Sequence, residues 1–236
     1  MNALLSRFQE CLMRQSTQPS RLCVCTNISP LHGHCLKKSN ILCGQLLSTV
    51  VLSTDIVPTM SSPIIYMIRH GEKPPKDANG DDVNGLSVQG INRAQGLRQV
   101  FGASSQYNIG YVLAEHPKKD GSRARPFETV APLASDLGLT VDTTINRDDA
   151  VGVAQAAKAY TGPGNVLVCW EHGQLAAIAA AIGVEKYAEK TGLTGKVKYP
   201  DDRFDLIWTV REPYVEVKGV VSEAVPGLDD EHVNQK

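Results

Sequence analysis

The segment Ile64-Ile-Tyr-Met-Ile-Arg69-His-Gly-Glu72 decides the fold and directs attention to one edge of it. Its apolar first half contains β-branched and aromatic residues and is typical of a buried strand. The strand ends in Arg69 and His70, which places a cation and an imidazole at its carboxyl end. In open α/β sheets this is the edge at which ligands bind. Gly71 permits a sharp turn and lets a ligand approach the backbone closely.

The pair Arg69 and His70 suits an anion, above all a phosphate group. A guanidinium binds two oxygens at once, and an imidazole can attack phosphorus. An ordinary strand that happens to end in Arg and His fits the same residues equally well. The other parts of the chain have to distinguish these two interpretations.

Composition excludes some classes of function. The 236 residues carry 24 basic and 25 acidic side chains, a net charge of −1, so no global field attracts nucleic acid or a membrane surface. A hydrophobic content of 42% is enough for a proper core. No apolar stretch approaches the length that spans a bilayer. We therefore expect neither a nucleic-acid nor a membrane partner, and any affinity for phosphate must come from a local cluster.

The first 59 residues differ from the rest. They hold five basic and two acidic residues and many Ser, Thr, Asn and Gln. This composition is typical of a mitochondrial transit peptide. A misassigned extension upstream of a start at Met60 in a cytoplasmic protein is the alternative that we favour. In both cases we expect a poorly ordered leader over residues 1–59 and a catalytic domain over residues 60–236. Cys23-Val-Cys25 is too closely spaced for a zinc pair, and we expect no metal site there.

From Met60 onward, short strands alternate with helices, which predicts a three-layer α/β/α domain with a mostly parallel central sheet. The expected strands cover residues 64–68, 109–113, 140–145, 165–170, 205–210 and 214–221. The first expected helix begins at the N-cap Ser87. Three further helices are expected over residues 125–137, 149–160 and 174–182. In the first helix, Ile91, Ala94, Leu97 and Phe101 have the spacing of one buried face. The end of the chain from Val225 is expected to be an exposed acidic segment.

A second strand ends in the same way as the first. Val166-Leu-Val-Cys-Trp170 is followed by Glu171-His172-Gly173, and a helix comes next. If the two strands are parallel neighbours, both imidazoles emerge at the same edge of the sheet. The first turn of the helix would also offer free N–H groups to an anion. The repeated layout favours a functional interpretation of His70 and His172.

Four blocks of the chain resemble the histidine phosphatase superfamily, which includes the phosphoglycerate mutases. They are Arg69–Glu72 after its strand, Leu86–Leu97 with Arg93 where glutamine is usual, Arg125-Pro-Phe-Glu-Thr129, and the strand that leads to His172. With the strands that follow, they span residues 64 to about 210. The four blocks together are specific, whereas Arg-His-Gly alone is weak.

This resemblance implies a phosphoglycerate mutase-like fold and a chemistry that needs no metal or cofactor. His70 would be the nucleophile that attacks a phosphomonoester, and water would then hydrolyse the phosphohistidine. Arg69, Arg125 and His172 would line the phosphate pocket, and we add Glu72 to the residues expected to bind substrate. The two arginines remain charged and should disfavour protonation of His70.

The sequence departs from the family in two places. His116-Pro117 stands where Ser-Pro is usual, and in the longer loop that follows, Arg123 competes with Arg125 for the pocket. We prefer Arg125 because its spacing to Thr129 matches the family block. The second departure concerns the general acid.

A carboxylate often follows the family arginine by some two dozen residues, and both Asp148 and Asp149 lie at about that separation. We take Asp149 as the catalytic acid, although it also fits an N-cap of the next helix. Glu72 and Glu171 are the alternatives.

The leading hypothesis is thus a metal-independent phosphatase that acts on a small phosphorylated substrate or a phosphoprotein. Two alternatives stay open. One is a mutase-type phosphotransferase, which the compact chain disfavours. The other is a phosphate-binding module without catalysis.

Overall fold

A computed structural model of the chain describes residues 61–230. The expectations for residues 1–59 concern a segment outside this range, so they stay predictions. In the described range no helix is long and apolar enough to cross a membrane.

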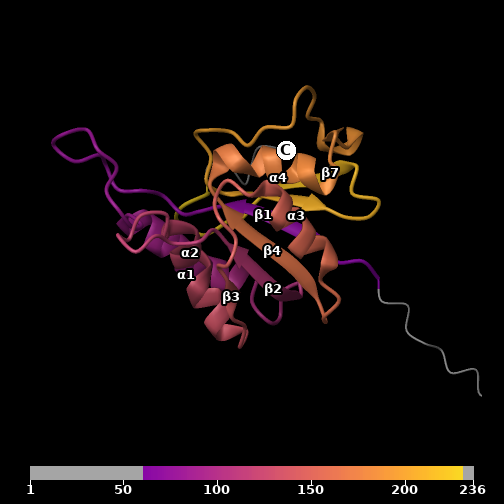
Figure 1. Cartoon of the computed structure of the whole chain (residues 1–236), viewed down its shortest axis with the longest axis horizontal. Helices are drawn as coiled ribbons and strands as arrows, with labels where there is room; N and C mark the ends of the chain where they lie inside the picture. The colour runs from indigo at the N-terminus through magenta and orange to yellow at the C-terminus, as the bar shows by residue number, and fades with distance from the viewer. Residues whose placement is uncertain (1–60, 231–236) are drawn as a thin grey trace, which may run out of the picture. The chain divides into compact units, whose positions relative to one another are not determined.

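A mixed, mostly parallel sheet of seven strands forms the centre of the fold (Figure 1). Its strands are β1 (Ile65–Arg69), β2 (Ile109–Ala114), β3 (Val141–Asp142), β4 (Asn165–Trp170), β5 (Lys186–Tyr187), β6 (Leu206–Val210) and β7 (Glu216–Ser222). They are arranged in the order β3-β2-β4-β1-β6-β7-β5. β6 is antiparallel to β1 and β7, and the other pairs are parallel. The predicted architecture is confirmed.

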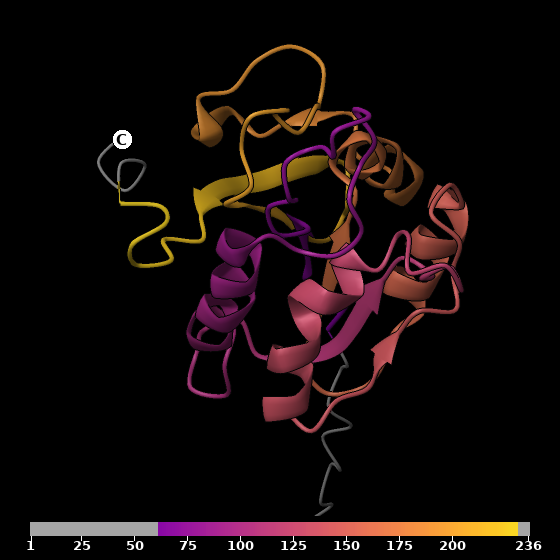
Figure 2. The ribbon, with the colours of Figure 1, turned by 90° about the vertical axis from the view of Figure 1, so that its left-hand side faces the viewer.

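Two pairs of helices cover the two faces of the sheet (Figure 2). On one face, α1 (Val88–Val100) and α2 (Arg125–Asp136) pack with the β1 side chains Tyr66 and Ile68. On the other, α3 (Ala150–Ala159) and α4 (His172–Ile182) pack with Ile65 and Met67. A single turn of 3₁₀ helix, η1 (Glu189–Thr191), follows β5. The alternation of buried side chains along β1 is what a strand between two layers of helices requires.

Several boundaries differ from the sequence prediction. β3 has only two residues where six were expected, and the two-residue β5 was not predicted. A strand this short has no periodicity of its own, and β5 exists through its pairing with β7. α4 begins at His172, two residues earlier than expected, because the Glu171 side chain accepts a hydrogen bond from Gly173 N and caps the helix.

The buried face of α1 corrects another expectation. Ile91 is exposed, whereas Arg93 is buried together with Ala94 and Leu97. The charge of Arg93 is tolerated in the interior because Glu72, Glu223 and Asp229 all contact its guanidinium, at 2.6–2.8 Å.

The end of the described chain is therefore not the exposed segment that we expected. Val225 and Asp229 are buried, and Val225 N donates a hydrogen bond to the Asp229 carboxylate. Asp229 in turn accepts from Arg93, which attaches this segment to α1.

Candidate active site

Register in the sheet brings the two histidine segments together. β1 and β4 are parallel neighbours, with Arg69 opposite Trp170, and His70 N donates to Trp170 O at 3.1 Å. The condition on which the sequence argument depended is thus met. His70 follows β1 directly, and His172 opens α4 just beyond the end of β4.

The surroundings of His70 select one tautomer and one charge state. Its Nδ1 lies 2.7 Å from Gly71 O, which can only accept, so Nδ1 carries the proton and Nε2 has the free lone pair. Burial lowers the pKa of His70 to about 4, and the charges of Arg69 and Arg125 act in the same direction. The sequence argument gave the right direction, although burial is the largest cause. Near neutral pH, His70 is therefore an unprotonated imidazole whose Nε2 lone pair is free.

Position 71 favours glycine because the first turn of α1 packs closely against its backbone. A Cβ at this position would lie 3.0 Å from Gly90 O and 3.1 Å from Gly90 Cα, in the first turn of α1. Gly71 N donates to Thr129 Oγ1 at 2.8 Å, and the same hydroxyl donates to Arg125 O at 2.7 Å. Thr129 thereby connects the segment that contains His70 to the helix that carries Arg125.

Within residues 61–230, no carboxylate lies at hydrogen-bond distance from the Arg69 guanidinium. Its Nη1 donates to Asp201 O at 2.7 Å and Arg203 O at 2.8 Å, and its guanidinium carbon lies 3.6 Å from the centre of the Phe204 ring. Burial lowers the pKa of Arg69. Backbone carbonyls orient a guanidinium but leave its net charge in place, and this charge remains for a ligand.

Arg125 is held in the same manner from another loop. Its Nε donates to Gly85 O at 2.9 Å, and its Nη2 donates to Val83 O at 2.6 Å. Arg125 is the first residue of α2, where Pro126 fits because it has no N–H to satisfy.

His172 lies between two carboxylates. Its Nδ1 is 2.7 Å from Glu171 Oε1, and its Nε2 is 3.3 Å from Asp201 Oδ1. Burial and the charge of Arg69 lower the pKa of His172, while Glu171 and Asp201 act in the opposite direction. Because Glu171 caps the helix, the first turn of α4 is partly occupied by protein, and the N–H groups expected from the sequence are not all free for an anion.

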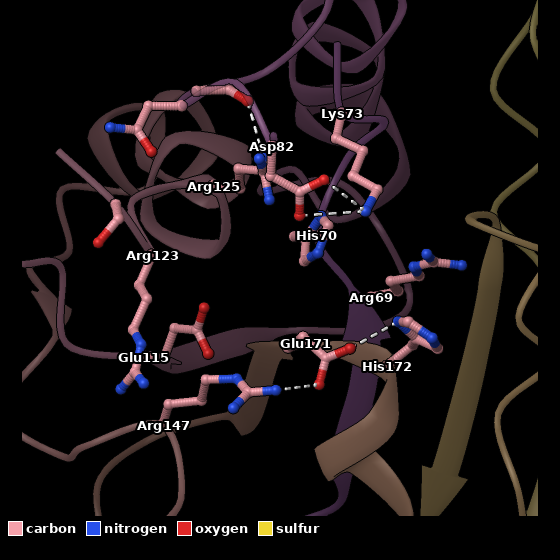
Figure 3. Close-up of a pocket in the computed structure, with 13 residues that line it drawn as sticks. Arg69, His70, Lys73, Asp82, Glu115, Arg123, Arg125, Arg147, Glu171 and His172 are labelled. Atoms are coloured by element: carbon pink, nitrogen blue, oxygen red, sulfur yellow. Dashed lines mark hydrogen bonds and ion pairs between the residues drawn. The ribbon is translucent and has the colours of Figure 1, made fainter. Parts of the chain in front are cut away.

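The side chains of four residues line one cavity of about 380 Å³, namely Arg69, His70, Arg125 and His172 (Figure 3). Its other lining residues are mostly polar or charged, namely Lys73, Asp82, Asn84, Gly85, Glu115, Ser122, Arg123, Arg147 and Glu171. Arg123 thus shares the cavity with Arg125. The site is a cationic pocket with two imidazoles, of a size that admits a phosphate group and a small attached moiety.

Two of the expected site residues are not among the lining residues. Asp149 lies at the N-terminus of α3, where its carboxylate accepts a hydrogen bond from Gly152 N at 2.8 Å, which is the capping role that its position also allowed. Glu72 is buried against the Arg93 guanidinium. Neither carboxylate lies in the wall of the cavity, so we do not assign either of them a catalytic or binding role.

Glu115 is a cavity residue that the sequence analysis did not select. It directly follows Ala114, the last residue of β2, which is paired with Cys169 of β4. Glu115 therefore lies at the same edge of the sheet as the two histidines. An acidic residue after an apolar strand was a signal of the same kind as the one that identified His70.

No protein-family model and no curated protein sequence matches the chain. Among solved structures, SixA from Agrobacterium tumefaciens is 11% identical, with a TM-score of 0.47 over 68% of this chain and 98% of that one. The protein histidine phosphatase SixA complexed with tungstate is 18% identical, with a TM-score of 0.45 over 68% and 97%. A mycobacterial glucosyl-3-phosphoglycerate phosphatase with inorganic phosphate is 17% identical, with a TM-score of 0.36 over 52% and 79%.

Proposed function

We propose that this protein is a metal-independent phosphomonoester hydrolase that works through a phosphohistidine on His70. One observation carries the proposal: an unprotonated imidazole lies in a cavity with two arginines, and no carboxylate lies at hydrogen-bond distance from either guanidinium among the described residues. Such an arrangement supplies a nucleophile together with charge that an anion can neutralise.

The chemistry follows from the properties of phosphoryl transfer. Negative charge spreads over the three equatorial oxygens in the transition state, so catalysis is mostly positioning and charge stabilisation. Nε2 of His70 attacks phosphorus while Arg69 and Arg125 bind the equatorial oxygens. His172 lines the same cavity. A bound dianion favours the protonated form of its imidazole, which then adds a third cation.

The dimensions of the cavity set the substrate class. About 380 Å³ accommodates a phosphate and a compact organic group, and either a small molecule or a phosphorylated side chain meets this limit. Tungstate and inorganic phosphate, as oxyanions of similar shape, should bind the cavity and compete with substrate.

Hydrolysis of p-nitrophenyl phosphate by the wild type and by His70→Ala tests the proposal. We expect the substitution to lower kcat by at least about 10³-fold, as is typical when a covalent nucleophile is removed. Rapid acid-free quenching after incubation with ³²P-labelled substrate should trap an acid-labile phosphohistidine in the wild type. The label should be absent in His70→Ala and present in His116→Ala, which removes an exposed histidine outside the cavity.

Two other outcomes correspond to the alternative functions. If the wild type and His70→Ala are equally inert but bind tungstate equally well, the protein is a binding module and the proposal fails. If the wild type transfers the label to a second phosphomonoester faster than to water, it is a mutase-type transferase.

A further inference from the structure

Glu115 carries a buried carboxyl group that the described part of the chain does not fully satisfy. Its exposed fraction is 3%, and Oε2 has no hydrogen-bond partner among the described residues. Glu115 nevertheless lines the cavity, and Figure 3 shows its carboxyl group in a different wall from His70, facing the same space. An unsatisfied buried carboxyl group is costly to a fold unless a ligand completes it or function requires it.

We propose that Glu115 is the proton donor to the leaving oxygen in the hydrolysis described above. The inference rests on the proposed function. As Nε2 of His70 bonds to phosphorus, the bond between phosphorus and the ester oxygen breaks, and its electron pair stays on that oxygen. The carboxyl proton of Glu115 moves to the oxygen, which leaves as an alcohol.

The second half of the reaction returns the proton. Water attacks the phosphorus of the phosphohistidine, and the Glu115 carboxylate accepts a proton from this water. The bond between phosphorus and Nε2 breaks, and its electron pair returns to the imidazole. Inorganic phosphate leaves, and both His70 and Glu115 are restored to their starting states.

The protonation state of Glu115 fits this role. Burial raises its pKa to about 7, with Glu171 and Asp148 raising it further and with Arg147 and Arg123 opposing the change. A donor whose pKa lies near the working pH both holds and releases its proton. The cavity therefore contains a neutral imidazole and a carboxylic acid near neutral pH, as the two roles require.

The other carboxyl groups around Glu115 are already engaged. Glu171 caps α4 and contacts both Arg147, at 3.1 Å, and His172. Burial alone would raise the pKa of Glu171, but the hydrogen bond from Gly173 and the charges of His172 and Arg147 lower it. Asp148 is mostly exposed and lies 3.0 Å from Arg147. Glu171 therefore stays ionised and makes a poor proton donor.

The dependence on the leaving group tests the assignment. For an alkyl phosphate, whose alkoxide is a poor leaving group, Glu115→Gln should lower kcat/KM by about 10² to 10⁴-fold. For p-nitrophenyl phosphate, which needs no proton donor, the same variant should lose less than about 10-fold. Glu185→Gln, the same change at an exposed glutamate outside the cavity, should alter neither value. Equal losses on both substrates, or no loss on the alkyl phosphate, would overturn the assignment.

The wild type alone supplies a second test, which holds even if Glu115→Gln fails to fold. With the alkyl phosphate, kcat/KM should fall as pH rises through about 7, because the donor loses its proton. With p-nitrophenyl phosphate, this fall in kcat/KM at alkaline pH should be absent after both profiles are corrected for the ionisation of the substrate's own phosphate group. An identical fall on both substrates contradicts the role of Glu115. Hydrolysis of p-nitrophenyl phosphate that depends on His70 keeps the proposed function intact in that event.

Discussion

Arginine is used in two opposite ways in this fold. Arg69 and Arg125 are bonded to backbone carbonyls, which orient a guanidinium without neutralising it. Arg93 instead faces three carboxylates, those of Glu72, Glu223 and Asp229. The two regions differ in what neutralises the guanidinium: the protein's own carboxyl groups do so in the Arg93 cluster, whereas in the cavity we propose that a bound anion does.

The Arg93 cluster shows the features of a structural site. Burial alone would lower the pKa of Arg93, but hydrogen bonds to Asp229 and Glu72 raise it. Burial raises the pKa of Glu223 to about 8 despite Arg93, so this carboxyl group is largely protonated near neutral pH and the excess of negative charge is reduced. A shifted pKa therefore does not by itself identify a functional group.

The largest effect is expected from Arg69→Met. It removes one of the two charges that we propose bind the transferring phosphoryl group, and such a charge is typically worth about 10³-fold or more in kcat. The free energy of unfolding should fall by only about 1–2 kcal/mol, because the lost partners are carbonyls rather than carboxylates. Steady-state kinetics and urea unfolding measure the two quantities. A protein that keeps its turnover would show that the charge in the cavity is not used.

The same substitution in the other region, Arg93→Met, should have the opposite profile. Removing the cation leaves three buried carboxyl groups without their partner, and breaking such a cluster costs about 3–5 kcal/mol of stability. At a temperature where the variant is folded, kcat should remain within a few-fold of the wild type. Loss of turnover without loss of stability would place Arg93 in the catalytic machinery and erase the contrast.

A smaller effect is expected from Asp201→Asn, which tests how a carboxylate of the protein next to His172 affects anion binding. The Asp201 carboxylate lies 3.3 Å from His172 Nε2 and is mostly exposed, so it competes with an incoming anion for that nitrogen. The variant should bind inorganic phosphate a few-fold more tightly, as measured by competitive inhibition. Lys198→Gln removes the other ion-pair partner of Asp201 and serves as the comparison. Weaker binding in Asp201→Asn would mean that this carboxylate supports the site.

The sequence was sufficient for the parts of the site that local pattern encodes. Apolar strands that end in a histidine predicted β1 and β4, and the register of this pair brought His70 and His172 to one edge. Arg125 was selected through the family resemblance, because its spacing to Thr129 matches the family block.

Features that depend on distant segments could not be predicted in this way. Arg93 was given no place in the core because helical periodicity counts arginine as polar, and its partners Glu223 and Asp229 lie 130 and 136 residues away. Asp149 and Glu115 are both acidic residues next to a helix or a strand. Only the position of Glu115 in the cavity wall distinguishes it, as a candidate acid, from Asp149, which caps a helix. The same limit applies to β5, which is defined by its neighbour.

The carbonyl groups that hold Arg69 and Arg125 have a consequence for how this site tolerates change. Every residue has a carbonyl, so the side chains at Val83 and Arg203 can be replaced while the acceptors stay in place. A deletion in either loop displaces the acceptors themselves. The two loops that hold these arginines can therefore change in composition but are constrained in length, so that substitutions there can reshape the cavity while both guanidinium groups stay in place.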